Sequence, residues 1–223
     1  MEKERHVLVV FPHPDDEAFG VSGTLATHVQ NGTPVTYACL TLGEMGRNMG
    51  NPPFTNRENL PKIRKEELKA AASAIGIQDL RMLGFRDKTI EFEDEDYMTN
   101  TMLGILEEVN PSLVITFYPG YSVHPDHDAT GAAVVRAVGK LPAAARPTLH
   151  CVAFSNNCIE ELGEADIIND ITPVADKKLA AIRAHRSQTE QMLAGMEEKL
   201  KNQDPQTMVW INNERFWTYK FTN

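Results

Sequence analysis

Short runs of apolar, mostly β-branched residues alternate with amphipathic stretches along the chain. The runs have the length and composition of buried strands, and they lie at 7–11, 34–42, 79–83, 113–118, 148–154 and 167–171. The stretches between them predict helices at 18–31, 61–75, 97–109, 126–138 and 175–186, while 208–221 is expected to close the fold as extended chain. Strands that alternate with helices predict an α/β fold, a Rossmann-like three-layer sandwich with a mostly parallel sheet.

A polar cluster follows the first predicted strand directly. It reads His13-Pro14-Asp15-Asp16-Glu17. Ligands of open α/β sheets bind at the carboxyl ends of the strands, and His13 and Asp16, three apart across a tight turn, can aim at one point. This is a metal site in outline. Two other readings fit the motif alone: acidic caps at a helix N-terminus, each worth about 0.3–1 kcal/mol, and the magnesium-holding acids of phosphoryl-transfer proteins.

A second cluster favours the metal. It reads His124-Pro125-Asp126-His127, and it too follows a predicted strand and opens a predicted helix. Two His/Asp clusters at strand-to-helix junctions are hard to explain as separate caps. Together they supply three nitrogen and oxygen donors, and histidine is a common ligand.

Together the two motifs resemble the signature of the LmbE-like, or PIG-L, family of zinc-dependent N-acetylglucosamine deacetylases. Other segments match the family in order along nearly the whole chain: 41–46, 64–67, 84–87 and 185–188. Within the family the chain is most similar to the deacetylases of bacillithiol biosynthesis. The resemblance implies an LmbE-like fold and hydrolysis of an N-acetylglucosaminyl amide, with N-acetylglucosaminyl-malate as the expected substrate.

The resemblance also implies a ligand set and a cofactor. Zn²⁺, with Fe²⁺ as the alternative, would be held by His13, Asp16 and His127. Three protein ligands leave a coordination position open, as in catalytic zinc sites. Such an ion lowers the pKa of water to about 7 and polarises a carbonyl.

Catalytic roles follow from the same resemblance. Asp15 would be the general base, and His124 the general acid or the stabiliser of negative charge on the acyl oxygen. Asp126 is expected to hold the ring of His124 in position and to raise its pKa.

Candidate substrate contacts lie mainly on loops at the same edge of the sheet. The segment 43–61 is long for a loop inside a compact domain, and such loops are usually functional or mobile. The candidates are Glu44, Arg47, Arg57, Arg64, Arg86 and His185. The arginines are the cations that could meet the carboxylates of malate. Each has a plainer alternative: a solvated loop residue, an ion pair of Arg64 with Glu67, or a histidine at a helix end.

Composition narrows the class of protein. At 223 residues, one domain covering 1–223 is the default. The net charge of −9, with no basic run, argues against nucleic acid as a partner, and no apolar run is long enough to cross a membrane. Three cysteines without a C-x-x-C pair indicate reduced thiols and a cytoplasmic protein. Relatives of the resembling family suggest a homo-oligomer.

Several alternatives stay open. An amidase of bacillithiol conjugates, or a deacetylase of chitin-type sugars, would use the same metal chemistry. A non-catalytic sugar- or metal-binding protein would not require Asp15 and His124. A receiver-type phosphorylation domain would need a lysine after the fifth strand, and none follows it directly in this chain. A dinucleotide site would need G-x-G-x-x-G after the first strand, and this motif is absent.

Overall fold

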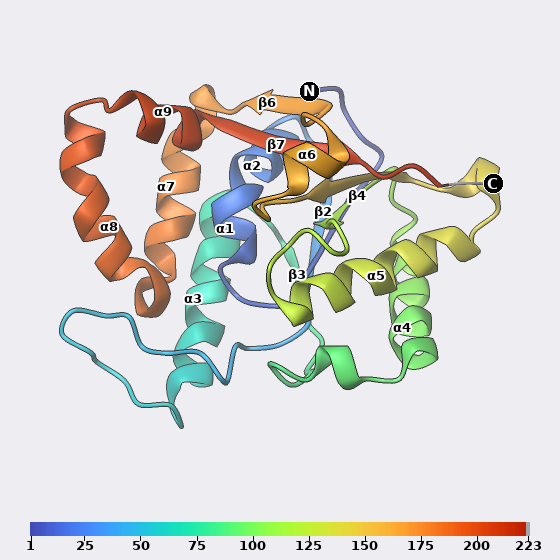
Figure 1. Cartoon of the computed structure of the whole chain (residues 1–223), viewed down its shortest axis with the longest axis horizontal. Coiled ribbons are helices and arrows are strands. Elements are labelled where there is room, and N and C mark those ends of the chain that lie inside the picture. The colour runs from blue at the N-terminus through green and yellow to red at the C-terminus, as the bar shows by residue number, and fades with distance from the viewer. Residues whose placement is uncertain (222–223) are drawn as a thin grey trace.

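The computed structural model describes residues 1–221 and contains one seven-stranded sheet with helices on both faces (Figure 1). The strands are β1 (Val7–Phe11), β2 (Val35–Cys39), β3 (Asp79–Met82), β4 (Leu113–Phe117), β5 (Thr148–Val152), β6 (Ile167–Asp170) and β7 (Asn213–Thr218). Their order in the sheet is β3-β2-β1-β4-β5-β7-β6. The first five are parallel, and β7 runs antiparallel to both β5 and β6. The predicted α/β class and mostly parallel sheet are confirmed.

The α-helices are α1 (Asp16–Gly20), α2 (Ser22–Gln30), α3 (Leu60–Ile75), α4 (Glu95–Val109), α5 (Pro125–Lys140), α6 (Cys158–Leu162), α7 (Ala175–Ala184), α8 (Arg186–Lys201) and α9 (Pro205–Asn212). Three short 3₁₀ helices are η1 (Ile90–Phe92), η2 (Ala143–Ala145) and η3 (Thr172–Val174). No helix within residues 1–221 combines the length and apolarity needed to cross a bilayer.

The alternation of side chains along the central strands creates two cores. Val7, Val9 and Phe11 of β1 pack into the core under α1, α2, α3 and α7. Leu8 and Val10 face the other way, into the core under α4 and α5. All five side chains are at most 1% exposed, so β1 is buried on both faces, as expected of a central parallel strand. The result is the predicted three-layer arrangement (Figure 1).

The predicted helix 18–31 is in fact two helices. The backbone of Val21 leaves the helical region, with φ −141° and ψ −5°, and separates α1 from α2. The first turn of α2 then donates the N–H groups of Gly23 and Thr24 to the carboxylate of Glu214 on β7, at 3.0 and 2.7 Å. A partner about 190 residues away in sequence therefore stabilises the break.

The C-terminal region also differs from the prediction. Within 208–221, expected to be extended, residues up to Asn212 belong to α9, and only then does β7 begin. Pro205 opens α9, and the carboxylate of Asp204 accepts the N–H of Thr207 at 2.9 Å, which caps the helix. The predicted helix 175–186 ends at Ala184, and α8 follows it after a single residue.

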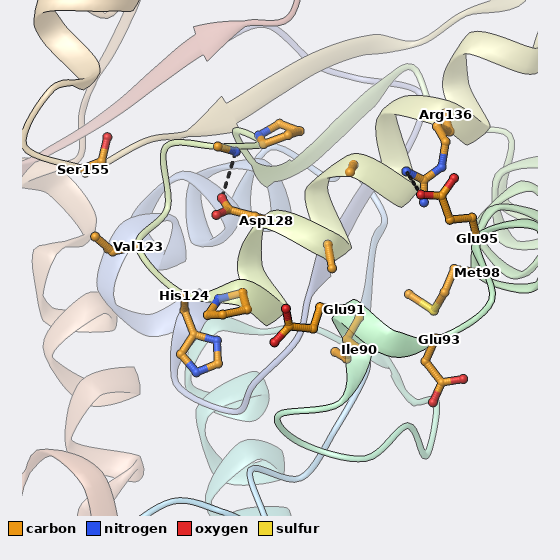
Figure 2. Close-up of a pocket in the computed structure, with 15 residues that line it drawn as sticks. Ile90, Glu91, Glu93, Glu95, Met98, Val123, His124, Asp128, Arg136 and Ser155 are labelled. Atoms are coloured by element: carbon orange, nitrogen blue, oxygen red, sulfur yellow. Dashed lines mark hydrogen bonds and ion pairs between the residues drawn. The ribbon is translucent and has the colours of Figure 1, made fainter.

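A hollow lies beside the loops at the carboxyl ends of the parallel strands. This acidic cavity, as it is called below, has a volume of about 680 Å³ and lies between the segment from η1 to α4 and the start of α5. Glu91, Glu93 and Glu95 line one side of it, and His124 and Asp128 line the other (Figure 2). The second histidine motif therefore faces open space.

Candidate metal centre and active site

The two histidine motifs lie at the point where the strand order reverses. From β1 the chain winds outward through β2 to β3, then returns to β4 on the other side of β1 and continues to β5. The first motif follows β1 and the second follows β4, and these strands are paired neighbours. A reversal of this kind leaves a crevice at the carboxyl ends of the strands, where α/β proteins bind ligands.

A tight turn after β1 separates the two adjacent aspartates. Asp15 has a left-handed backbone, with φ 100°, and its N–H donates to Glu17 Oε2 at 3.1 Å. Asp16 opens α1, and its Oδ2 accepts the N–H of His13 at 2.8 Å. The turn thus folds the Asp16 carboxylate back toward His13 and leaves Asp15 free for another contact.

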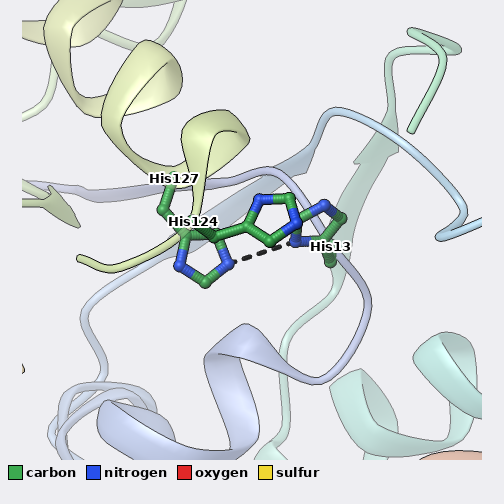
Figure 3. A group of neighbouring side chains, drawn as sticks. All are labelled: His13, His124 and His127. Atoms are coloured by element: carbon green, nitrogen blue, oxygen red, sulfur yellow. Dashed lines mark hydrogen bonds between the residues drawn. The ribbon is translucent and has the colours of Figure 1, made fainter. Parts of the chain in front are cut away.

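Three predicted ligands come together in the structure. His13 Nδ1 lies 3.2 Å from His127 Nε2 (Figure 3). Asp16 Oδ1 lies 3.3 Å from His127 Nε2, and Asp16 Oδ2 lies 3.5 Å from His13 Nδ1. His13, Asp16 and His127 are called the donor cluster below. The ring of His124 also adjoins it, since potential ligand atoms of the three histidines lie within 4.8 Å of one another.

The outer nitrogen of each ring in the donor cluster is already engaged. His13 Nε2 lies 3.1 Å from Asp87 Oδ1 and 3.2 Å from Asp126 Oδ2, so it carries the proton. His127 Nδ1 lies 3.0 Å from the carbonyl oxygen of Ser122 and carries the proton there. These tautomers are assigned from the contacts. When both rings are neutral, the lone pairs of His13 Nδ1 and His127 Nε2 face each other beside the Asp16 carboxylate.

This arrangement fits a divalent metal ion. Facing lone pairs repel one another unless a cation lies between them. Nitrogen and oxygen ligands about 2.0–2.2 Å from a tetrahedral zinc ion stand roughly 3.3–3.6 Å apart, which matches the 3.2, 3.3 and 3.5 Å separations within the donor cluster. The carboxylates and the carbonyl on the outer nitrogens are the supports that metal-binding histidines usually have.

The two aspartates of the turn differ in acidity. Although burial acts to raise it, contacts with His127 and His13 hold the pKa of Asp16 well below its usual range. Burial raises the pKa of Asp15 to about 6, against the opposing effect of the Arg64 guanidinium. Asp15 can therefore exchange a proton near neutral pH, whereas Asp16 remains a carboxylate.

His124 is half-buried at the border of the acidic cavity. Its Nδ1 accepts the backbone N–H of Asp126 at 3.1 Å, so the proton of the neutral ring lies on Nε2. Burial, together with His13 and His127, lowers the pKa of His124 below its ordinary value. The ring is therefore a neutral hydrogen-bond donor at neutral pH.

Asp126 does not make its predicted contact with His124. Its fully buried carboxylate lies against His13 Nε2 and accepts the N–H groups of Lys88 and Ile90, at 2.7 and 3.2 Å. Only its backbone N–H meets His124. The side chain at the second position of a helix turns toward the core here, so Asp126 orients a member of the donor cluster.

The structure also gives Arg64 a different place from the predicted one. Its side chain is only 4% exposed. The guanidinium donates to the carbonyl oxygens of Pro14 and Gly43 and to Asp15 Oδ2, the last at 3.2 Å. Arg64 thus ties the Asp15 turn to the loop after β2, and it makes no ion pair with Glu67, the plainer alternative. Its contact with substrate stays a prediction.

His185 lies below the site rather than at its rim. It is fully buried, and its Nε2 lies 2.5 Å from Oε1 of Glu17, which is also fully buried. The other oxygen of Glu17 accepts the hydroxyl of Tyr37 at 3.0 Å and the N–H of Asp15. Burial opposes protonation of His185, but Glu17 raises its pKa above the usual value. A buried ion pair therefore supports the turn that carries Asp15.

The remaining candidates lie in loops. Glu44 is partly buried and accepts the N–H of Asp87 at 3.1 Å. Arg47, Arg57 and Arg86 are exposed. The loop 43–61 is held against the first turn of α8, where the side chain of Gln188 donates to the carbonyl oxygen of Arg47 at 2.9 Å. These three arginines remain candidates for substrate contact.

Two residues of the site received no role in the sequence analysis. Asp87 is 3% exposed and supports His13 from the loop after β3. Glu17 belongs to the first motif but points below it, toward His185. Asp87 follows β3, another parallel strand, and this position in the sequence could have indicated that Asp87 lies at the site. Nothing local in the sequence connects Glu17 to a residue 168 positions later.

Comparisons with known proteins agree that this chain is similar to de-N-acetylases and deacetylases. The family described as "GlcNAc-PI de-N-acetylase" (PIG-L) matches residues 8–138. A Bacillus cereus protein named "Probable N-acetyl-alpha-D-glucosaminyl L-malate deacetylase 2" is 58% identical over 218 residues, 98% of this chain and 99% of that protein. A Bacillus subtilis (strain 168) protein of the same name is 54% identical over 220 residues, 99% of this chain and 100% of that protein. The solved structure of N,N'-diacetylchitobiose deacetylase from Pyrococcus horikoshii has a TM-score of 0.73 and 25% identity, covering 97% of this chain and 84% of that one.

Proposed function

The chain belongs to the PIG-L family of de-N-acetylases, and we propose that it removes acetate from N-acetylglucosaminyl-malate in bacillithiol biosynthesis. The observation that carries the proposal is that Asp15 and His124 both lie beside the donor cluster. His127 of the cluster shares a cavity with Asp15, whereas His124 borders the acidic cavity. A site that only binds a sugar or a metal would need neither Asp15 nor His124. The relatives' shared name supplies the substrate.

His13, Asp16 and His127 would hold the cofactor, which we propose to be Zn²⁺ with Fe²⁺ as the alternative. When bound, the ion would supply Lewis acidity that polarises the acyl carbonyl and acidifies water. Asp87 and Asp126 would keep the proton of His13 on Nε2, so that Nδ1 stays available.

Asp15 would act as the general base. Its pKa of about 6 lies close to neutrality, where a carboxylate can accept a proton from water and later give it to the departing amine. Arg64 holds one carboxylate oxygen at 3.2 Å, and Glu17 holds the backbone N–H at 3.1 Å. These contacts would fix the direction in which Asp15 accepts the proton.

His124 would stabilise negative charge as it develops on the acyl oxygen. Because Nδ1 accepts the N–H of Asp126, the ring presents Nε2–H as a fixed donor. A donor that is already oriented contributes more than a solvent molecule that must reorient, and removing one such donor typically lowers kcat by about 10²–10³-fold.

The exposed arginines would recognise malate. Arg47, Arg57 and Arg86 lie on loops that follow β2 and β3 and present guanidinium groups to solvent. Guanidinium binds carboxylates in bidentate fashion. We assign this role to the exposed arginines before Arg64, because both terminal nitrogens of Arg64 already have partners within the protein.

The test is release of free amine from N-acetylglucosaminyl-malate, measured beside N-acetylglucosamine and a bacillithiol conjugate, with and without a chelator. We expect chelator-sensitive release from the malate glycoside, a large loss in Asp15→Asn, and little change in Asp96→Asn, an exposed aspartate on α4. Release only from another substrate would reject malate and keep the chemistry. Full activity in Asp15→Asn would reject the proposed base.

A further inference from the structure

A second cavity reaches the donor cluster, since Asp16 and His127 line it. Its volume is about 440 Å³, and Asp15, Asp16 and His127 are the charged and polar side chains in its wall. The rest of the wall is almost entirely apolar and comprises Phe11, Phe19, Phe117, Val152, Phe154 and Trp210. It is called the aromatic cavity below. Aromatic side chains bury large apolar areas, so this space suits an apolar group attached directly to the reacting carbon.

The acidic cavity is the more polar of the two. Glu91, Glu93 and Glu95 line the acidic cavity, which can meet hydroxyl groups with hydrogen-bond acceptors. The charged and ionisable side chains of the aromatic cavity are all residues of the reaction centre, Asp15, Asp16 and His127. An N-acyl amino sugar has one hydroxylated part and one apolar part. The sugar therefore fits the acidic cavity, and the acyl chain fits the aromatic cavity.

The aromatic cavity is much larger than an acetyl group requires. The methyl group of acetate occupies a volume comparable to that of one water molecule, about 30 Å³ in the liquid. A cavity of about 440 Å³ leaves most of its apolar wall uncovered by that methyl group. A longer chain would cover more of Phe19, Phe154 and Trp210.

We propose that the aromatic cavity is an acyl-chain site and that the enzyme also hydrolyses N-acyl amino sugars whose apolar acyl chain is longer than acetyl. This inference rests on the proposed function and extends its substrate class. The water oxygen forms a bond to the acyl carbon and the C–N bond breaks. Both protons of the water end on the amine, which leaves as an ammonium group, and the acyl chain leaves as a carboxylate.

The size of the expected effect follows from burial. Each methylene group transferred from water to an apolar site contributes about 0.8 kcal/mol, which is about a fourfold change in kcat/KM or in Kd. Four additional methylene groups separate acetyl from hexanoyl. Even partial burial of the chain should therefore make hexanoate bind at least tenfold more tightly than acetate.

Gly20 provides a way to fill the cavity. It lines the aromatic cavity at the end of α1, and a Cβ at this position would meet Val152 at an ordinary 3.6 Å. Gly20→Leu should therefore fold and project its side chain into the space. Gly104→Leu is the matched control, because Gly104 is exposed on α4 and a Cβ there would have no neighbour within 4 Å.

The experiment compares amine release from N-acetyl-, N-butyryl- and N-hexanoylglucosaminyl-malate in the metal-loaded enzyme. Calorimetry measures the binding of acetate and hexanoate to the same proteins. We expect hydrolysis of all three substrates and tighter binding of hexanoate. In Gly20→Leu the hexanoyl-to-acetyl ratio of kcat/KM should fall at least tenfold, whereas Gly104→Leu should keep the ratio of the unmodified chain.

The outcomes separate this inference from the proposed function. Turnover of the acetyl substrate alone, or an equal loss on both substrates in Gly20→Leu, would overturn the acyl-chain site and leave the proposed function standing. If no malate glycoside is hydrolysed, but hexanoate binds and Gly20→Leu abolishes its binding, the site is supported and the proposed function is rejected. Absence of hexanoate binding would overturn the site regardless of turnover.

Discussion

The buried pair of His185 and Glu17 gives a sharp prediction for the substitution His185→Gln. In the folded protein His185 Nε2 lies 2.5 Å from Glu17 Oε1, and neither side chain is exposed. The substitution removes the cation and leaves the carboxylate with the hydroxyl of Tyr37 and the N–H of Asp15. The Asp15 turn should then lose part of its support, so both stability and kcat should fall.

The magnitude follows from the complete burial of the pair. Removing one member of a buried ion pair typically costs about 3–5 kcal/mol. Glutamine can still donate one hydrogen bond, so the lower end of this range applies. For a chain of this size, about 3 kcal/mol corresponds to a decrease in Tm of roughly 6–12 °C.

The pH dependence has a definite sign. Folding raises the pKa of His185 above its unfolded value of 6.5, so the pair contributes fully below that pH. Its contribution decreases as the pH rises through the folded-state pKa, with a limiting slope of about 1.4 kcal/mol per pH unit. The stability difference between the unmodified chain and His185→Gln should therefore shrink above pH 6.5.

The assay is urea unfolding of the metal-free protein between pH 5 and 9. His28→Gln is the control, since His28 is also buried and burial lowers its pKa. A histidine with a lowered pKa destabilises the fold at low pH, so the stability of the unmodified chain relative to His28→Gln should rise with pH. A pH-independent difference for His185→Gln would refute the ion pair, and an unchanged kcat would refute its support of Asp15.

Three further predictions concern other buried contacts. Lys178 and Glu214 form a buried pair at 3.3 Å, so Lys178→Met should lower the free energy of unfolding by about 3–5 kcal/mol. Adding Glu214→Gln to this variant should restore part of the lost stability, as measured by denaturant titration. Because burial raises the pKa of Asp15 to about 6 and the base must be ionised, kcat/KM should decline tenfold per pH unit well below pH 6, which a pH–rate profile will show. Gly43 has φ +63°, and a Cβ there would collide with the Arg64 guanidinium, so Gly43→Ala should lower both Tm and kcat.

Local patterns were sufficient to predict much of the fold. The continuous apolar run of β1 predicted a strand buried on both faces, and the two motifs predicted one site because carboxyl ends of parallel strands share an edge. The convergence of His13, Asp16 and His127 agrees with that reasoning. What the sequence could not show is the division of α1 from α2, which depends on the distant Glu214.

The sequence also could not predict the direction in which some polar side chains point. Arg64 and His185 are polar residues near loops, and such residues are mostly exposed. Both are buried here because each meets a partner distant in sequence, Asp15 for Arg64 and Glu17 for His185. Pairing of this kind has no local periodicity, so the sequence could place these residues near the site but could not predict which way they point.

The most direct test of the account is a metal titration of the metal-free enzyme, followed by amine release from N-acetylglucosaminyl-malate. We expect activity to rise linearly with added Zn²⁺ or Fe²⁺ to a break at one ion per chain. We also expect that Asp87→Asn, which removes a support of His13, weakens metal binding by about 10–100-fold. Activity that is independent of added metal and of chelator, in a protein shown to contain none, would contradict the central claim.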